Sequence, residues 1–362
     1  MSKVRAHAYL DNTEPYLPGD FVVEGVAEVI KLSSNESLMG ASPAVADALR
    51  GTLGGLSTYP DSYCDALRLA IGTRHGLDPE RIVCEAGSEP LINLLARAYA
   101  GPGDEILYSQ FGFIAYKLAA EEIGATPVAA PEAEYTTDVD ALLANVSERT
   151  RIVFLANPNN PTGTLIPFSD VKRLRDNLPE HVLLVLDAAY AEFNDSASYS
   201  DGSELVEDDP GNVVVLHTFS KIYGLAALRL GWAYAPLGVY NILNQLRGVF
   251  TVSSVAQVAG VAALEDARHT DTVVQHNARW RTWLADALSG LGLRVFPSYA
   301  NFICVQFPSA LDAKMADLAL RQQGLIPRTL REYGLPDCLR ITIGLEVHCR
   351  RVVEVLGRIE RG

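Results

Sequence analysis

The chain has 362 residues, of which 48% are hydrophobic and 20% charged, as is typical of a globular protein with more than one domain. Its 44 acidic residues outnumber 30 basic ones, and the net charge of -14 disfavours nucleic acid and anionic membranes as partners. We see no secretion signal, no apolar run long enough to span a bilayer, and five scattered cysteines without metal-site spacing. These features predict a cytoplasmic enzyme or binding protein that acts on small molecules and holds no metal.

Short apolar runs alternate with longer amphipathic segments between residues 78 and 236. Helices are expected at 89–99, 113–123, 139–146 and 168–178. Strands are expected at 81–84, 105–108, 127–129, 151–155, 182–186, 213–216 and 230–234. Strands that are apolar on both faces and separated by helices indicate an α/β fold with a mostly parallel seven-stranded sheet. In such a sheet, ligands bind beyond the carboxyl ends of the strands.

The pattern changes after residue 239. A long helical region covers about 240–291, and two β-rich segments at 293–307 and 339–343 flank a helix near 311–323. We therefore predict a large domain at 46–245 and a smaller α+β domain at 246–362. The first 45 residues lack a strand pattern of their own and are expected to form an arm that packs against the small domain.

Polar residues follow several of the predicted strands, and each has an ordinary explanation when taken alone. Asp187 could cap a helix, Lys221 could be a solvated lysine, and the Asn- and Pro-rich loop at 157–163 could be a simple turn. Together they fit one chemistry. An enzyme that uses pyridoxal phosphate needs a lysine for a Schiff base and a carboxylate that keeps the pyridine nitrogen protonated. Lys221 and Asp187 are the candidates.

The cofactor's phosphate needs a cationic site rich in hydrogen-bond donors. Thr218, Ser220 and Arg229 can supply it, because a guanidinium matches two phosphate oxygens at once. The segment Gly87-Ser88-Glu89 follows a predicted strand and opens a predicted helix, where backbone N–H groups bind anions.

Seven segments also match, in order, the pattern of a known family: SNES at 34–37, YPD at 59–61, AGSE at 86–89, ANPNNPTG at 156–163, LDAAYAEF at 186–193, TFSKIYGLAALRLGW at 218–232 and LRITIG at 339–344. Through them the chain resembles the histidinol-phosphate aminotransferases, a group of fold-type I, pyridoxal-phosphate-dependent class-II aminotransferases. The resemblance covers nearly the whole chain. It implies a transfer between histidinol phosphate and 2-oxoglutarate that yields imidazole acetol phosphate and glutamate in histidine biosynthesis.

The resemblance also implies roles around the cofactor. Lys221 would be the covalent anchor and proton carrier, and Asp187 would pair with the pyridinium. Asn160 and Tyr190 would hydrogen-bond the phenolic oxygen of the ring, and Phe111 would stack on its face.

Further contacts follow from the same resemblance. The family is homodimeric with shared sites, so Tyr59 would reach the cofactor phosphate of the neighbouring subunit, and the arm would contact that subunit. Arg340 would bind a carboxylate, with Asn35 beside it, and Arg328 would meet the distal group of the substrate. Tyr16 would offer aromatic surface to the substrate, with plain core packing as the alternative.

The chain departs from the family at two places that concern the substrate. Thr251 replaces an asparagine near the substrate side chain, and Ser37-Leu38-Met39 replaces a Pro-containing segment at the mouth of the site. An aromatic amino acid aminotransferase of the same family is therefore the second candidate. A decarboxylase of an amino-acid phosphate fits less well, because Arg340 suits reversible transamination. A non-catalytic aminotransferase-like module would need an added DNA-binding segment, for which neither length nor charge leaves room.

Overall fold

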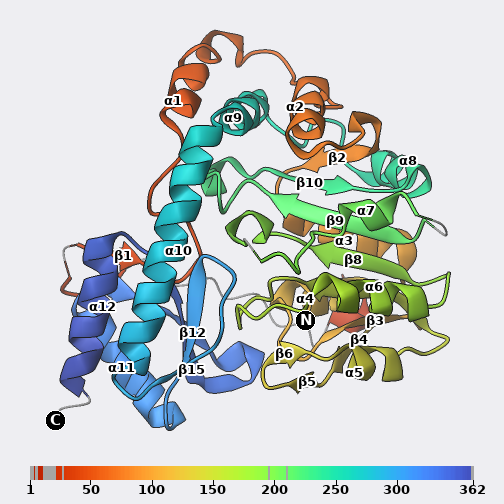
Figure 1. The fold of residues 1–362 in the computed structure, drawn as a ribbon. Coiled ribbons are helices and arrows are strands. Elements are labelled where there is room, and N and C mark those ends of the chain that lie inside the picture. The colour runs from red at the N-terminus through yellow and green to blue at the C-terminus, as the bar shows by residue number, and fades with distance from the viewer. Residues whose placement is uncertain are drawn as a thin grey trace.

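The computed structural model describes residues 4, 7–10, 22–26, 28–194, 196–208 and 211–359. Its main feature is a seven-stranded sheet with the strand order β2-β10-β9-β8-β7-β3-β4, in which β10 pairs antiparallel with both neighbours (Figure 1). All seven predicted strands are confirmed. Their bounds are β2 (Ile82–Glu85), β3 (Glu105–Ser109), β4 (Thr126–Ala130), β7 (Thr150–Ala156), β8 (Leu183–Asp187), β9 (Val213–Thr218) and β10 (Gly231–Tyr234).

Helices cover both faces of this sheet, which explains why its central strands lack polar alternation. Every residue of β8 and β9 is buried. One face packs against α3 (Ser88–Tyr99), α4 (Ile114–Glu122) and α8 (Leu237–Leu246). The other packs against α2 (Asp65–His75), α5 (Val139–Ala144), α6 (Phe168–Asn177), α7 (Ser203–Val206) and α9 (Ser254–Glu265). The helix α1 (Pro43–Arg50) packs on α9.

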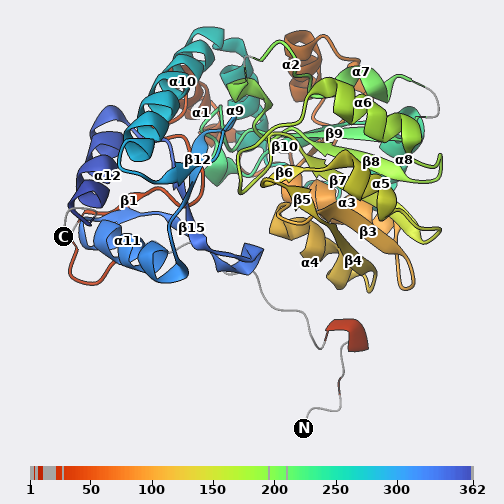
Figure 2. The ribbon, with the colours of Figure 1, turned by 60° about the horizontal axis from the view of Figure 1, so that its bottom comes forward.

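A second, four-stranded antiparallel sheet lies beside the large one, with the order β11-β12-β15-β14 (Figure 2). It comprises β11 (Arg294–Val295), β12 (Phe302–Gln306), β14 (Arg328–Leu330) and β15 (Leu335–Thr342). The helices α10 (Ala267–Ser289), α11 (Ala310–Gln322) and α12 (Glu346–Ile359) contribute to its core. Two short paired strands, β5 (Glu132–Ala133) and β6 (Thr136–Thr137), lie outside both sheets.

The arm joins the small domain through its backbone. Its strand β1 (Ile30–Lys31) pairs in parallel with β13 (Leu325–Ile326). The helical region expected at 240–291 consists of three helices, because Ser253 and Asp266 each cap the start of a new one. The predicted boundary at 245/246 falls within the last turn of α8, and α9 contributes Ala256, Ala259 and Ala263 to the core of the large sheet.

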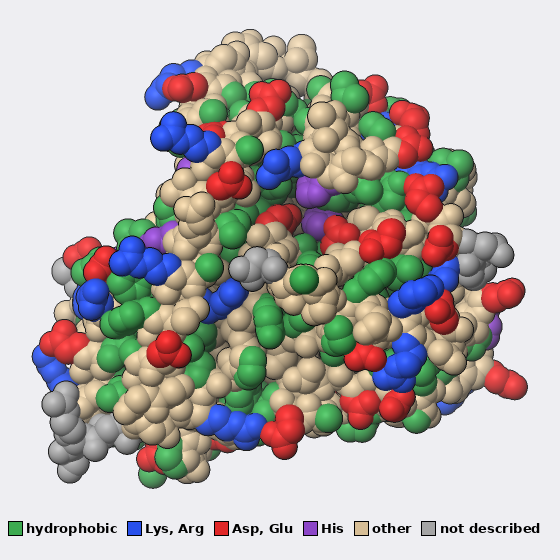
Figure 3. Space-filling view, viewed as in Figure 1, with side chains coloured by type: hydrophobic (Ala, Val, Ile, Leu, Met, Phe, Trp, Pro, Cys, Tyr) green, Lys and Arg blue, Asp and Glu red, His purple; other side chains and the backbone are tan. Residues whose placement is uncertain are grey.

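The distribution of charged side chains, the lengths of the helices and the state of the cysteines relate to the predictions made from composition. On the face shown in Figure 3, acidic and basic side chains are interspersed over both domains. Within the residues that the structure describes, no helix combines the length and the apolar composition needed to cross a bilayer. All five cysteines are buried free thiols.

Candidate active site

A cavity of about 290 Å³ lies between the ends of the large-sheet strands, the arm and the small domain. The residues that line it come from all three parts of the chain. They are Ser33, Ser34, Asn35, Glu36, Ser88, Glu89, Phe113, Ala156, Pro158, Asn160, Asp187, Ala189, Tyr190, Thr218, Ser220, Lys221, Ala226, Arg229, Arg328, Tyr333 and Arg340. Most of the predicted site residues therefore converge here.

Asp187 is the last residue of β8 and is buried at the cavity floor. Burial raises the pKa of this carboxyl group above its usual value. The Tyr116 hydroxyl donates a hydrogen bond of 2.7 Å to Oδ2, and the Ala189 N–H donates one of 3.1 Å to Oδ1, which favour the ionised form. A carboxylate fixed in this way suits a cationic ring nitrogen.

Lys221 follows β9 by three residues and points into the same cavity. Burial, assisted by the positive charge of Arg340, lowers the pKa of Lys221 to about 8. A lysine with that pKa is partly unprotonated near neutral pH, the form that acts as a nucleophile and a base. Its Nζ donates to the Ser34 carbonyl at 3.0 Å and lies 6.0 Å from the centre of the Tyr190 ring.

An anion cradle lies next to Lys221, where α3 begins. Gly87 has a φ of 110°, and a Cβ added there would lie 2.7 Å from Nη2 of Arg229. Gly231 must also be a glycine, since its Cβ would lie 2.5 Å from the Ser88 nitrogen. Nη1 of Arg229 lies 3.4 Å from the Ser220 hydroxyl. The backbone N–H groups at the start of α3 and the Arg229 guanidinium together fit a phosphate.

Two arginines face the cradle from the small domain. Arg328 on β14 and Arg340 on β15 are register partners across an antiparallel pair, so their side chains emerge on the same face. Both side chains are buried and line the cavity. Arg340 donates to the Asn160 side chain, and its Nη2 donates to the Ser33 carbonyl at 2.6 Å. The arrangement can hold two anionic groups of one substrate, or the carboxylates of two different substrates.

Asn35 connects the arm to both domains. Its backbone has a φ of 56°, and its Nδ2 donates to the Tyr190 hydroxyl at 2.9 Å. Its carbonyl accepts from Asn301 at 3.0 Å, and its Oδ1 accepts from the Thr342 hydroxyl at 3.2 Å. Asn35 thereby fixes the position of Tyr190 in the cavity.

Three predicted contacts with the cofactor or the substrate involve residues that are not among those lining the cavity. The Phe111 ring stacks on Tyr135 at 5.8 Å and is not among the residues that line the cavity; Phe113, two residues later, is. The Phe111–Gly112 turn directs the chain so that the second phenylalanine faces the site. The Thr251 hydroxyl donates to Glu85 at 2.8 Å, also outside the lining set. Ser37, Leu38 and Met39 line a separate small cavity with His276.

Tyr59 does not line the cavity of this chain. Tyr59 is 80% exposed and stacks on Phe250, with ring centres 4.4 Å apart. Tyr16 lies outside the described residues, so its predicted contact stays a prediction.

Several groups around the site were not predicted from the sequence. Tyr116 is a fully buried tyrosine in α4, and the sequence gives no signal that its hydroxyl meets Asp187. His217 lies one residue before Thr218, stacks on Trp232 at 4.3 Å and binds Asp201 through Nε2 at 3.0 Å. Burial alone lowers the pKa of His217, but the carboxylates of Asp201 and Glu192 outweigh it and raise that pKa to about 9.

This combination of a large mixed sheet, a buried lysine, a carboxylate and a phosphate cradle defines a fold-type I pyridoxal-phosphate enzyme. The family model for aminotransferase class I and II matches residues 27–356. The chain is 51% identical over 350 residues to the histidinol-phosphate aminotransferase of Rhodospirillum rubrum, which covers 96% of this chain and 95% of that protein. It is 52% identical over 344 residues to the same enzyme of Paramagnetospirillum magneticum, with 94% of each chain covered.

A solved structure agrees with these relatives. The histidinol-phosphate aminotransferase of Sinorhizobium meliloti, in complex with pyridoxal 5'-phosphate, matches with a TM-score of 0.86 and 28% identity over 92% of each chain. The chain therefore belongs to the class I and II aminotransferase family. It is an aminotransferase, and pyridoxal phosphate is its cofactor, as the resemblance predicted.

Proposed function

We propose that this aminotransferase moves the amino group of histidinol phosphate to 2-oxoglutarate. The observation that carries the proposal is the pair of buried guanidiniums, Arg328 and Arg340, on register positions of adjacent strands in one cavity. Histidinol phosphate carries a distal phosphate, and glutamate carries two carboxylates. A site with two fixed cations accepts both in turn, as a two-substrate exchange requires. The identities of about 50% to relatives named histidinol-phosphate aminotransferase support histidinol phosphate as the amino donor.

Different residues of the chain bind the cofactor and transfer the proton. Bound in the cradle, pyridoxal phosphate supplies an electron sink for the bond changes at the substrate carbon. Ser88, Thr218, Ser220 and Arg229 hold its phosphate, and Asp187 holds its ring nitrogen in the protonated state. Lys221, with its pKa lowered to about 8, moves the proton between two atoms of the bound substrate.

Asn160 and Tyr190 connect the cofactor with the substrate. Both line the cavity, and Asn160 also accepts a hydrogen bond from Arg340. A substrate anion on Arg340 thus lies close to the group that orients the ring. Phe113 takes the stacking role proposed above for Phe111, because its side chain is the one at the cavity.

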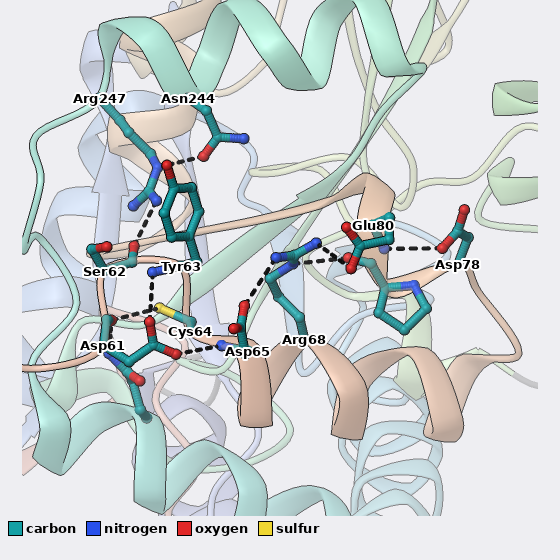
Figure 4. A network of polar contacts seen from close by, with 12 residues as sticks. Asp61, Ser62, Tyr63, Cys64, Asp65, Arg68, Asp78, Glu80, Asn244 and Arg247 are labelled. Carbon is teal, nitrogen blue, oxygen red and sulfur yellow. Dashed lines mark hydrogen bonds and ion pairs between the residues drawn. The ribbon is translucent and has the colours of Figure 1, made fainter.

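We further propose a homodimer in which Tyr59 contacts the cofactor phosphate of the partner subunit. Tyr59 and its stacking partner Phe250 are both exposed, at 80% and 45%. The loop behind them is fixed, as Figure 4 shows: Asp61 accepts from the Tyr63 and Asp65 N–H groups at 2.9 and 2.7 Å, and Arg247 binds the Ser62 carbonyl. A rigid loop that presents an exposed ring suits a contact between subunits. We expect the dimer to act in the cytoplasm.

The second candidate, an aromatic aminotransferase, shares the same arginines but has no use for a cation at the distal group of phenylalanine. Arg328→Ala tests the difference. The variant should raise KM for histidinol phosphate roughly 10- to 150-fold, because it loses a charge-assisted hydrogen bond, and should change KM for phenylalanine little. Arg340→Ala should instead impair glutamate and phenylalanine through their carboxylates.

Steady-state kinetics of both variants on histidinol phosphate, phenylalanine and glutamate measure this crossed pattern. Equal losses on all three donors in the Arg328 variant would contradict phosphate recognition and favour the aromatic aminotransferase.

A further inference from the structure

Glu332 lies beside the substrate arginines without lining the cavity itself. It belongs to the turn Arg331–Tyr333 between β14 and β15, and its carboxylate accepts a hydrogen bond from Nη2 of Arg328. The Arg328 side chain is 10% exposed and that of Glu332 is 35% exposed. The next residue, Tyr333, does line the cavity. The ion pair therefore places a negative charge next to a guanidinium that lines the cavity, while the carboxylate itself is not part of the lining.

The charges around the cavity explain why a carboxylate is stable there. Four cationic side chains line this one cavity, those of Lys221, Arg229, Arg328 and Arg340. Arg340 is held by uncharged acceptors, the Asn160 side chain and the Ser33 carbonyl, and Lys221 by the Ser34 carbonyl. Arg328 differs, since its guanidinium is bonded directly to an anion.

We propose that Glu332 is a built-in counter-ion that limits how tightly Arg328 holds the distal anion of a substrate. The inference rests on the proposed role of Arg328 and adds a specificity-determining residue to it. A phosphate that binds Arg328 also feels the negative charge of Glu332, so part of the attraction is cancelled. A guanidinium has five N–H donors, so an anion in the cavity and Glu332 can bind it at the same time.

Weaker binding of the phosphate at Arg328 is useful in this reaction. Histidinol phosphate and its product carry the same phosphate, so binding energy at the phosphate is equal before and after the transfer. Such uniform binding lowers KM without lowering the chemical barrier, and it holds the product as firmly as the substrate. Glu332 therefore favours exchange of product for the next substrate.

The test compares Glu332→Gln with the wild-type holoenzyme, using inorganic phosphate as a competitive inhibitor. Glutamine keeps an acceptor for Nη2 and removes only the charge. We expect the inhibition constant of phosphate and the KM of histidinol phosphate each to fall about 3- to 10-fold, as for a partly exposed charge. KM for phenylalanine should change less than 2-fold, because that donor has no distal anion.

Two further variants test whether the effect is specific to the charge of Glu332 and whether it acts through Arg328. Glu354→Gln removes a carboxylate from an exposed ion pair on α12 and should leave both constants unchanged. In an Arg328→Ala background, Glu332→Gln should lose its effect on phosphate inhibition, because the coupling runs through the guanidinium.

The proposal is overturned if Glu332→Gln leaves phosphate inhibition unchanged, or if it raises the inhibition constant and KM together, as loss of a positioning contact would. A persistent effect in the Arg328→Ala background overturns it as well. Failure of the proposed function looks different: the wild-type enzyme would not prefer histidinol phosphate to phenylalanine, whatever phosphate does in the variants.

Discussion

The cavity wall formed by the large sheet and the opposite wall, formed by the arm and the small domain, are assembled in different ways. On the first wall, Asp187 ends β8, Thr218 ends β9, and Ser88 begins α3. Each position follows from one strand and the turn after it. On the second wall, Arg340 binds the carbonyl of Ser33, which is 307 residues away in the chain. The first wall requires one folded sheet, whereas the second requires three separate segments to dock. The residues that we propose for the cofactor are therefore positioned by local structure, whereas those that we propose for the substrate depend on how the parts of the chain dock.

The largest expected effect comes from the first wall. Lys221→Ala should lower transamination by at least about 10⁴-fold, because it removes both a covalent anchor and a proton carrier. Pyridoxal phosphate should still bind through the cradle, which equilibrium dialysis can measure. Turnover at the wild-type rate, without added amine, would rule out this role for Lys221.

Asp187→Asn should come next, with a loss of about 10²- to 10⁴-fold in kcat. A neutral amide cannot hold the ring nitrogen protonated, and the buried charge pair loses one member. Circular dichroism should show an intact fold, since the amide oxygen can still accept from the Ala189 N–H and the amide nitrogen can donate to the Tyr116 hydroxyl. A variant with wild-type kcat would mean that Asp187 is a structural residue and that the ring nitrogen has another partner.

Asn35→Gly tests the second wall. Glycine accepts the φ of 56° but removes the bonds from the side chain to Tyr190 and Thr342. We expect KM for both substrates to rise about 10-fold, while the dissociation constant of pyridoxal phosphate changes less than about 2-fold. If cofactor affinity falls as much as substrate affinity, the two walls are not independent and the comparison fails.

The smallest effect concerns the layer beneath the first wall. Burial, together with the charge of His217, lowers the pKa of His75 from 6.5 to about 4. Because the folded-state pKa is depressed, neutral His75 contributes its full stability above pH 6.5, and this contribution is lost as pH falls toward 4.

Thermal unfolding of the wild type and His75→Gln at pH 7.5 and 5 measures this contribution. The wild type should lose about 1–3 kcal/mol more than the variant over that range. An equal loss in both proteins would mean that His75 titrates normally in the folded state.

The sequence predicted the first wall well, and the reason is geometric. A run such as Val182 to Leu186 is apolar because both faces of its strand are covered, so the polar residue after it marks the strand end. The family resemblance predicted that Phe111 stacks on the cofactor, but Phe113 is the phenylalanine that lines the cavity, because a turn of two residues decides which ring faces it. The strand pattern also gave no signal for Tyr116, whose hydroxyl meets Asp187 only after α4 packs on the sheet.

Local sequence thus determined the seven strands, the helices between them and the polar residues that the strand ends bring to the cavity, because each depends on the pattern of its own segment. Tertiary structure alone decided which groups are partners. It placed Arg328 opposite Arg340 through strand register, gave Arg328 the Glu332 counter-ion, and turned the Thr251 hydroxyl to Glu85 and away from the cavity. The Thr251–Glu85 contact joins residues 166 positions apart, and the two contacts of Arg328 depend on the register and the turn of β14 and β15. No hydrophobic periodicity within one segment encodes such contacts.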